Sequence, residues 1–211
     1  MVSIQKAGGL LVLMIAAIFL LSTPASVYAE EVEKKAEKSD GKQILGVENV
    51  LPKEKLSQQY KRIIIRDMSF EGAAIQQVDE TKHPDFKNVV KQLGTAVPDN
   101  IAAQLKTWGI FEKVVREGED VSGDEKTIIL VARFTKVTTG NRAARFWVGF
   151  GAGSSTVGIA GKLIDKDTGK VIADFESNAH SPMSMSNYRT VLPADGAQNA
   201  KKIAMFIKKY Y

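Results

Sequence analysis

The first candidate for chemistry is the stretch RFWVGFGAGSS, residues 145–155, in which glycine occupies positions 149, 151 and 153. A dinucleotide-binding loop requires G-x-G-x-x-G, but Ser154 stands where the third glycine should be. A phosphate loop ending at Gly161 and Lys162 also fails, because Thr156 and Leu163 occupy two of its required positions. Both motifs must open a helix, whereas the residues after Ser155 are typical of a strand. No nucleotide cofactor is therefore expected.

An extended conformation would divide this stretch into two faces, because side chains alternate along a strand. Phe146, Val148, Phe150 and Ala152 would form an apolar face. The opposite face would carry Arg145 and Trp147 and, beyond the tryptophan, only the nearly bare backbone of the three glycines. Such a face suits close packing in a sheet, a flexible edge, or contact with a partner or a membrane surface. For the third alternative the predicted partner-binding residues are Arg142, Arg145, Trp147, Gly149, Gly151 and Gly153.

Catalytic and metal-binding residues are scarce. The chain has two histidines, His83 and His180, and no cysteine, so no metal site is expected. Ser155, His180 and Asp165 could be combined as a catalytic trio on paper, but no G-x-S-x-G motif supports it. An alternative hypothesis keeps His180 as the base of a hydrolase that acts on envelope material. The alternating Asp165, Asp167 and Gly169 resemble the start of a calcium loop, but a hairpin turn explains them better.

The first 29 residues predict export. Lys6 precedes an uncharged apolar run at residues 10–21, and a small-residue site predicts cleavage after Ala29. An uncleaved membrane anchor is the alternative. Without cysteine the chain can carry neither a lipoprotein anchor nor a disulfide. The remaining chain has a charge of +4, which favours anionic lipid headgroups or cell-wall polymers over nucleic acid as partners in the periplasm.

The rest of the chain predicts a charged tether at residues 30–59 and one domain at residues 60–211. A strand begins near Tyr60, and a polar loop follows to Pro84. Apolar residues then recur at steps of three and four, which predicts a helix with Asp85 as its N-cap and Gly109 as its end. Pro98 should kink or split that helix.

Further strands are expected at residues 110–117 and 127–137, and a hairpin of two strands should turn at residues 167–169. Residues 180–193 are predicted to be irregular. A last helix should begin at Asp195 and bury Ala197, Ala200, Ile203, Ala204 and Ile207. The order predicts an α+β fold, with a mostly antiparallel sheet packed against one long helix and a C-terminal helix.

Three segments, TAVPDNIAAQLKTWGIFEKV, GNRAARFWVGFGAGSSTV and KLIDKDTGKVI, together with the alanine-rich last helix, resemble the bacterial exported family known as domain of unknown function 4410. The resemblance covers roughly residues 60–207 and implies no activity. Many members of that family are lipoproteins, and this chain departs from them by lacking the lipidation cysteine. A weaker similarity, at the level of the fold, is to non-catalytic periplasmic domains of lipoproteins for curli secretion and penicillin-binding-protein activation. The expected function is that of a non-catalytic envelope accessory protein, which binds a protein partner or the membrane surface.

Overall fold

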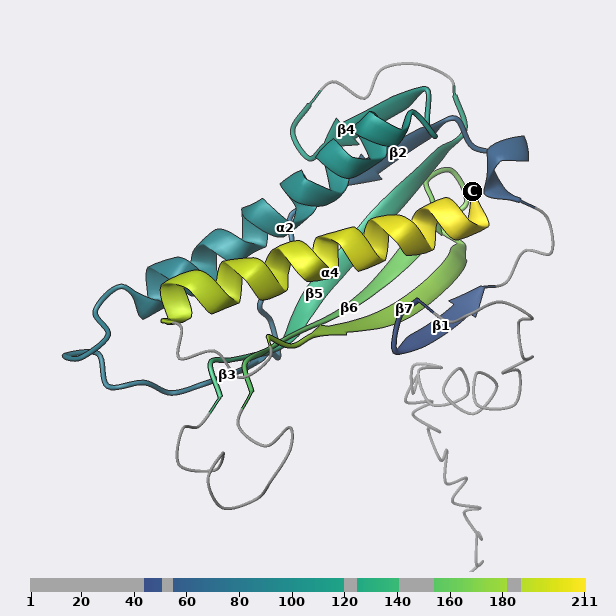
Figure 1. Cartoon of the computed structure of the whole chain (residues 1–211). Helices are drawn as coiled ribbons and strands as arrows, with labels where there is room; N and C mark the ends of the chain where they lie inside the picture. The colour runs from purple at the N-terminus through teal and green to yellow at the C-terminus, as the bar shows by residue number, and fades with distance from the viewer. Residues whose placement is uncertain (1–43, 51–54, 120–124, 141–153, 182–186) are drawn as a thin grey trace, which may run out of the picture. The chain divides into compact units, whose positions relative to one another are not determined.

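The computed structural model describes residues 44–50, 55–119, 125–140, 154–181 and 187–211, all within one compact unit, Gly41–Tyr211. This unit has a mixed seven-stranded sheet and two long helices, so the expected α+β class is confirmed (Figure 1). Its elements in chain order are β1 (Val47–Val50), the 3₁₀ turn η1 (Leu56–Gln58), β2 (Arg62–Ile65), β3 (Ala74–Ile75), α2 (Phe86–Trp108), β4 (Lys113–Arg116), β5 (Thr127–Thr138), β6 (Thr156–Asp165), β7 (Val171–Ala179) and α4 (Tyr188–Tyr210).

The strands are arranged in the order β1-β7-β6-β5-β2-β4, and β3 extends the sheet beside the end of β5. The long central strands β5, β6 and β7 pair antiparallel, while β2 lies parallel to both β4 and β5. The predicted hairpin is confirmed between β6 and β7. Gly169 adopts a φ of 70° in its turn, a conformation that favours glycine over residues with a side chain.

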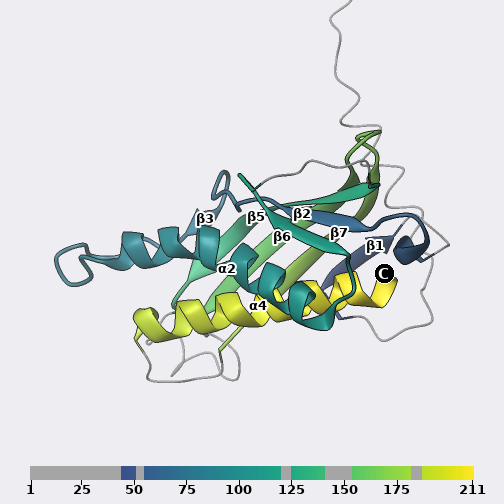
Figure 2. The ribbon, with the colours of Figure 1, turned by 90° about the horizontal axis from the view of Figure 1, so that it is seen from above.

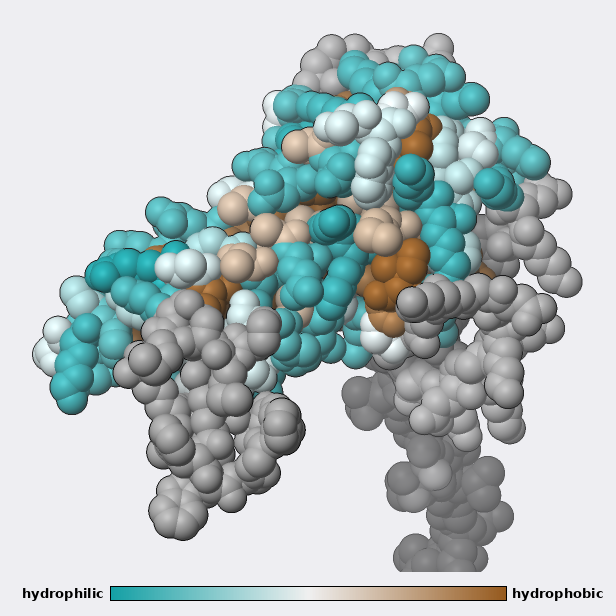
Figure 3. All heavy atoms as spheres, in the orientation of Figure 1, coloured by the Kyte–Doolittle hydropathy of each residue, from teal (hydrophilic) through white to brown (hydrophobic). Residues whose placement is uncertain are grey.

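Both helices cover the same face of the sheet and lie side by side, as the two perpendicular views agree (Figures 1 and 2). The strands alternate, so Leu130, Phe134 and Ile159 point toward the helices and are at most 1% exposed. The outward surface of the helices is mostly hydrophilic, with hydrophobic residues in small separate patches (Figure 3). The core is therefore a single layer between sheet and helices.

The periodicity of α2 is confirmed, since Phe86, Val90, Leu93, Val97, Ile101 and Leu105 are all buried. Gly109 ends the helix in the left-handed conformation, and its N–H reaches the carbonyls of Leu105 and Lys106. The helix is not split, because it continues through Pro98. Asp85 occupies the N-cap position, as predicted, but its side chain makes no capping hydrogen bond. Its carboxylate instead binds Arg189 at the start of α4.

The last helix begins earlier than the sequence indicated. It starts at Tyr188, where the side chain of Asn187 accepts a hydrogen bond from Arg189 N–H, so residues 188–193 are helical and not irregular. Pro193 obscured this start, because proline usually marks a break. Asp195 lies inside the helix and is 1% exposed. Of the predicted buried set, Ala200, Ile203, Ala204 and Ile207 are buried, while Ala197 is exposed.

The sheet also begins earlier than the boundary predicted at residue 60. Strand β1 lies within the segment expected to be a tether, and it pairs antiparallel with β7. Leu45, just before it, is 5% exposed and belongs to the core. A charged composition hid this strand because its apolar residues are few and separated.

Candidate functional site

The predicted binding residues Arg142, Arg145, Trp147, Gly149, Gly151 and Gly153 lie outside the described residues. The structure does define where that segment leaves and re-enters the fold. Thr138 at the end of β5 pairs with Thr156 at the start of β6, so residues 139–155 connect two adjacent antiparallel strands. Connections of this kind usually have two to five residues, and those longer than about 12–15 are commonly functional. Seventeen residues here indicate a specialised connection.

Gln76, which follows β3, anchors the outgoing side of this connection. Its Oε1 accepts hydrogen bonds from the Thr138 hydroxyl at 2.9 Å, the Thr139 N–H at 2.7 Å and the Thr139 hydroxyl at 2.8 Å. Gln76 N–H also donates to the carbonyl of Val137. One side chain thus fixes the last residues of β5 before the connection departs.

The returning side is also held by polar groups. Ser155 is only 3% exposed, and its Oγ accepts a hydrogen bond from the Ser181 N–H at 3.4 Å. The Ser181 hydroxyl donates to Asp195 Oδ1 at 2.6 Å, and Asp195 Oδ2 is buried without a partner among the described residues. These contacts fix the end of β7 against both β6 and α4.

His180 stands beside this group but does not join it. Its Nδ1 lies 3.0 Å from the Thr156 hydroxyl, and the residue is exposed. Asp165 is at the opposite end of β6, about 30 Å away at the usual rise of a strand. Ser155, His180 and Asp165 therefore do not assemble into a catalytic trio. His83 has its ring edge-on to Tyr188, with 5.3 Å between centroids.

Asp165 holds the β6–β7 turn. Its Oδ1 accepts the N–H groups of Asp167 and Thr168, and its Oδ2 accepts the Tyr60 hydroxyl at 2.7 Å. Burial alone would raise the pKa of Asp165, but the bonds from Tyr60 and the turn lower it to about 2. The same burial and the neighbouring carboxylate raise the pKa of Tyr60. The Asp165 carboxylate is thus a structural group that belongs to a hairpin, as the sequence favoured.

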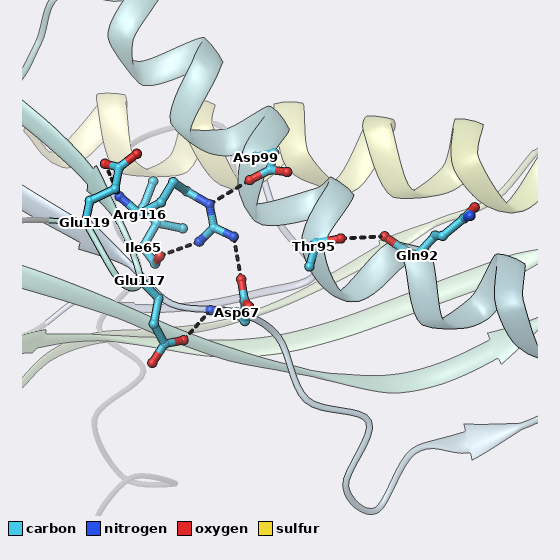
Figure 4. Close-up of polar contacts among 8 residues, drawn as sticks. All are labelled: Ile65, Asp67, Gln92, Thr95, Asp99, Arg116, Glu117 and Glu119. Carbon is cyan, nitrogen blue, oxygen red and sulfur yellow. Dashed lines mark hydrogen bonds and ion pairs between the residues drawn. The ribbon is translucent and has the colours of Figure 1, made fainter.

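A second polar cluster surrounds Arg116, at the end of β4 (Figure 4). The guanidinium binds Asp99 on α2 at 2.8 Å, Asp67 after β2, and the carbonyl of Ile65. Its side chain is only 14% exposed. Because two carboxylates and a carbonyl already occupy its donors, this arginine ties α2 to the parallel strands and offers little to an external anion.

In the part of the chain that the structure describes, no group of three or more histidine and acidic side chains is arranged to hold a metal ion. Nor does any helix of that part have the length and apolar character needed to cross a bilayer. The strongest candidate site is the polar end of the sheet, where the long connection begins and ends between anchored residues.

Comparison with known protein families shows the family of this chain. The family model for a domain of unknown function, DUF4410, matches residues 63–183. The chain belongs to the DUF4410 family. The match spans β2 to the end of β7 and includes the whole β5–β6 connection, which is thus part of the DUF4410 domain. A comparison with curated proteins gives no match.

Solved structures with some similarity to this DUF4410 protein are distant. The PelC dodecamer from Paraburkholderia phytofirmans is 15% identical, with 74% of this chain and 98% of that chain covered and a TM-score of 0.45. A Xanthomonas campestris protein matched to the family DUF330 is 11% identical, with coverage of 75% and 87% and a TM-score of 0.42.

Sequence reasoning missed the side chains that anchor the connection. Gln76 lies in a polar stretch and Asp195 was expected at the start of a helix, so neither had a local signal for its role. Thr138 and Thr156 did have a usable signal, because each lies at the end nearest the glycines of a long strand that contains many β-branched residues.

Proposed function

We propose that this DUF4410 protein is a non-catalytic binding protein of the cell envelope, and that the β5–β6 connection is its contact surface. The observation that carries the proposal is the seventeen-residue excursion between the paired residues Thr138 and Thr156. Both ends of this excursion are fixed by hydrogen bonds, from Gln76 on one side and around Ser155 on the other. Binding residues are commonly carried on connections whose ends a rigid scaffold holds in place.

The chemistry of the connection supports a macromolecular contact. Arg142, Arg145 and Trp147 are residue types enriched where binding energy concentrates in interfaces, and the three glycines leave room for close approach. The positive balance of the chain after residue 29 favours a partner or a membrane surface that carries negative charge. Export to the periplasm rests on the first 29 residues and is part of the proposal.

The test is photocrosslinking in intact cells that export the protein. A photoreactive residue replaces Trp147, and the control probe replaces Lys166, an exposed residue in the β6–β7 turn at the other end of the sheet. A specific adduct at 147 alone would support the proposal and name the partner as protein or lipid. Equal labelling at both positions, or none at either, would refute it.

A second variant tests whether loss of the contact can be separated from loss of the fold. If Gly151 acts in the contact and not in the core, Gly151→Val should abolish the adduct formed from position 147 while the melting temperature stays within about 2 °C of wild type, because substitutions away from the core usually change the free energy of unfolding little. If the variant crosslinks as fully as the protein with glycine at 151, the three glycines are not part of the contact surface.

A further inference from the structure

An apolar hollow of about 320 Å³ lies between the first turns of α2 and residues 70–80. We propose that this hollow binds the tail of a single-tailed amphiphile whose head group is anionic. The site is made of described residues alone and does not depend on the function proposed for the β5–β6 connection. Its lining residues belong to β3, to the segments on either side of β3 and to the first turns of α2.

Five apolar side chains shape the hollow. Phe86 and Val90 of α2 are 2% and 5% exposed, while Phe70, Ile75 and Val78 are only half-buried and pack against the core. Phe70 is fixed by stacking on Phe134 of β5, with 4.3 Å between ring centroids. Phe70 is therefore held in place from behind, and the apolar side chains leave a hollow between them.

The size and lining are typical of a ligand site. Pockets for small molecules usually occupy about 300–1,000 Å³, are mainly apolar and have a few polar groups that orient the ligand. Here the polar residues of the lining include Gln77, Glu80 and two lysines of α2, all of them exposed, which places them toward the rim. An apolar chain would fill the interior while its head remained at the rim.

The charge of the rim selects the head group. Lys87 pairs with Glu80 at 2.6 Å, so one positive and one negative charge compensate each other. Lys91, one helical turn further, is exposed and forms no ion pair with a described residue. The rim thus retains one uncompensated positive charge, which complements a carboxylate or phosphate.

The test measures binding of dodecanoate, below its micelle concentration, to the chain purified after export from an expressing bacterium. Isothermal titration should show one site, and shorter tails should weaken binding about fourfold for each methylene removed. Dodecyltrimethylammonium, which has the same tail and the opposite charge, should bind at least tenfold more weakly.

Two variants and one control locate the site. Ile75→Trp fills the hollow and Lys91→Glu reverses the rim charge, so each should weaken dodecanoate binding at least tenfold. Lys201→Glu makes the same charge change on the exposed side of α4 and should leave binding unchanged. Because Lys91 is exposed, its variant should fold normally, and thermal unfolding checks both.

The proposal fails if wild type does not bind dodecanoate, or if both variants bind it as wild type does. It also fails if affinity does not depend on tail length, since that result would show that the head group is bound and the tail is not buried. None of these outcomes depends on crosslinking from position 147, so the two proposals stand or fall separately.

Discussion

Asp165 connects two parts of the chain that are 105 residues apart. Its carboxylate accepts the Tyr60 hydroxyl and two N–H groups of the β6–β7 turn, and its side chain is 7% exposed. The hydrogen bonds favour the charged form, which lowers the pKa of this group in the folded protein to about 2. In the unfolded chain the pKa of an aspartate is about 3.9.

This difference predicts an acid-dependent loss of stability. Because the folded pKa is depressed, the stabilisation is fully present above about pH 4 and disappears as the pH falls toward 2. Asp165→Asn should therefore lower the free energy of unfolding by about 1–2 kcal/mol at pH 7 and by much less at pH 2. Urea denaturation at the two pH values measures this. Asp167→Asn, in the same turn, should change neither value, and an Asp165 variant with equal losses at both pH values would contradict the mechanism.

Position 161 requires glycine because of close packing in the core, and not because it binds phosphate. A Cβ at this position would stand 2.5 Å from Phe175 Cζ and 2.9 Å from Ala132 Cβ, both in the core layer. Gly161→Ala should therefore destabilise the protein by about 1–3 kcal/mol, as overpacking of a core does. Thermal unfolding compares it with Ala160→Ser on the other face of β6. A Gly161 variant as stable as wild type would mean that Phe175 moves aside without cost.

At the scale of elements, Asn199 fastens α4 to the sheet. It is fully buried, its Oδ1 accepts the Ser177 hydroxyl at 2.6 Å, and its Nδ2 donates to the carbonyl of Val157 at 2.7 Å. The helix is thereby bound to β6 and β7 together. Buried polar groups satisfied in this way fix one helix position among the alternatives that an apolar surface would permit.

Asn199→Ala should lower the free energy of unfolding by about 1–3 kcal/mol, because it leaves the Ser177 hydroxyl buried without its partner. A double-mutant cycle with Ser177→Ala tests this cause. The cost of the second substitution should be smaller once Asn199 is gone, and strictly additive losses would show that the two side chains act independently.

The elements differ in how far their sequences could predict them. Apolar residues at steps of three and four specify α2, and β-branched runs specify β5 and β6, because one side of each must be buried. The start of α4 escaped because Pro193 outweighed the cap at Asn187. The residues that anchor the candidate site were not predicted for another reason. Gln76 meets Thr139 only after β3 aligns with β5, and local sequence carries no information about such pairing.

At the scale of the molecule, the N-terminal edge of the sheet depends on one carboxylate. Glu48 in β1 accepts hydrogen bonds from the N–H groups of Ile44 and Leu45 and from the side chains of Lys209 and Tyr210 at the end of α4. Burial would raise the pKa of Glu48, but these bonds lower it below its ordinary value. The first strand and the last helix thus stabilise each other.

The stability of the domain should therefore depend on β1 and Leu45, although the composition of this segment predicted a tether. A chain that starts at residue 55 loses β1 and the buried Leu45, and it leaves Lys209 and Tyr210 without their carboxylate. Burial of a leucine alone contributes about 1.5–3 kcal/mol, so this chain should unfold at least 5 °C below one that starts at residue 41. A chain that starts at residue 30 is the control, and its melting temperature should equal that of the 41–211 chain. Equal melting of all three would place the start of the stable domain at η1, because β1 would then add a strand without adding stability.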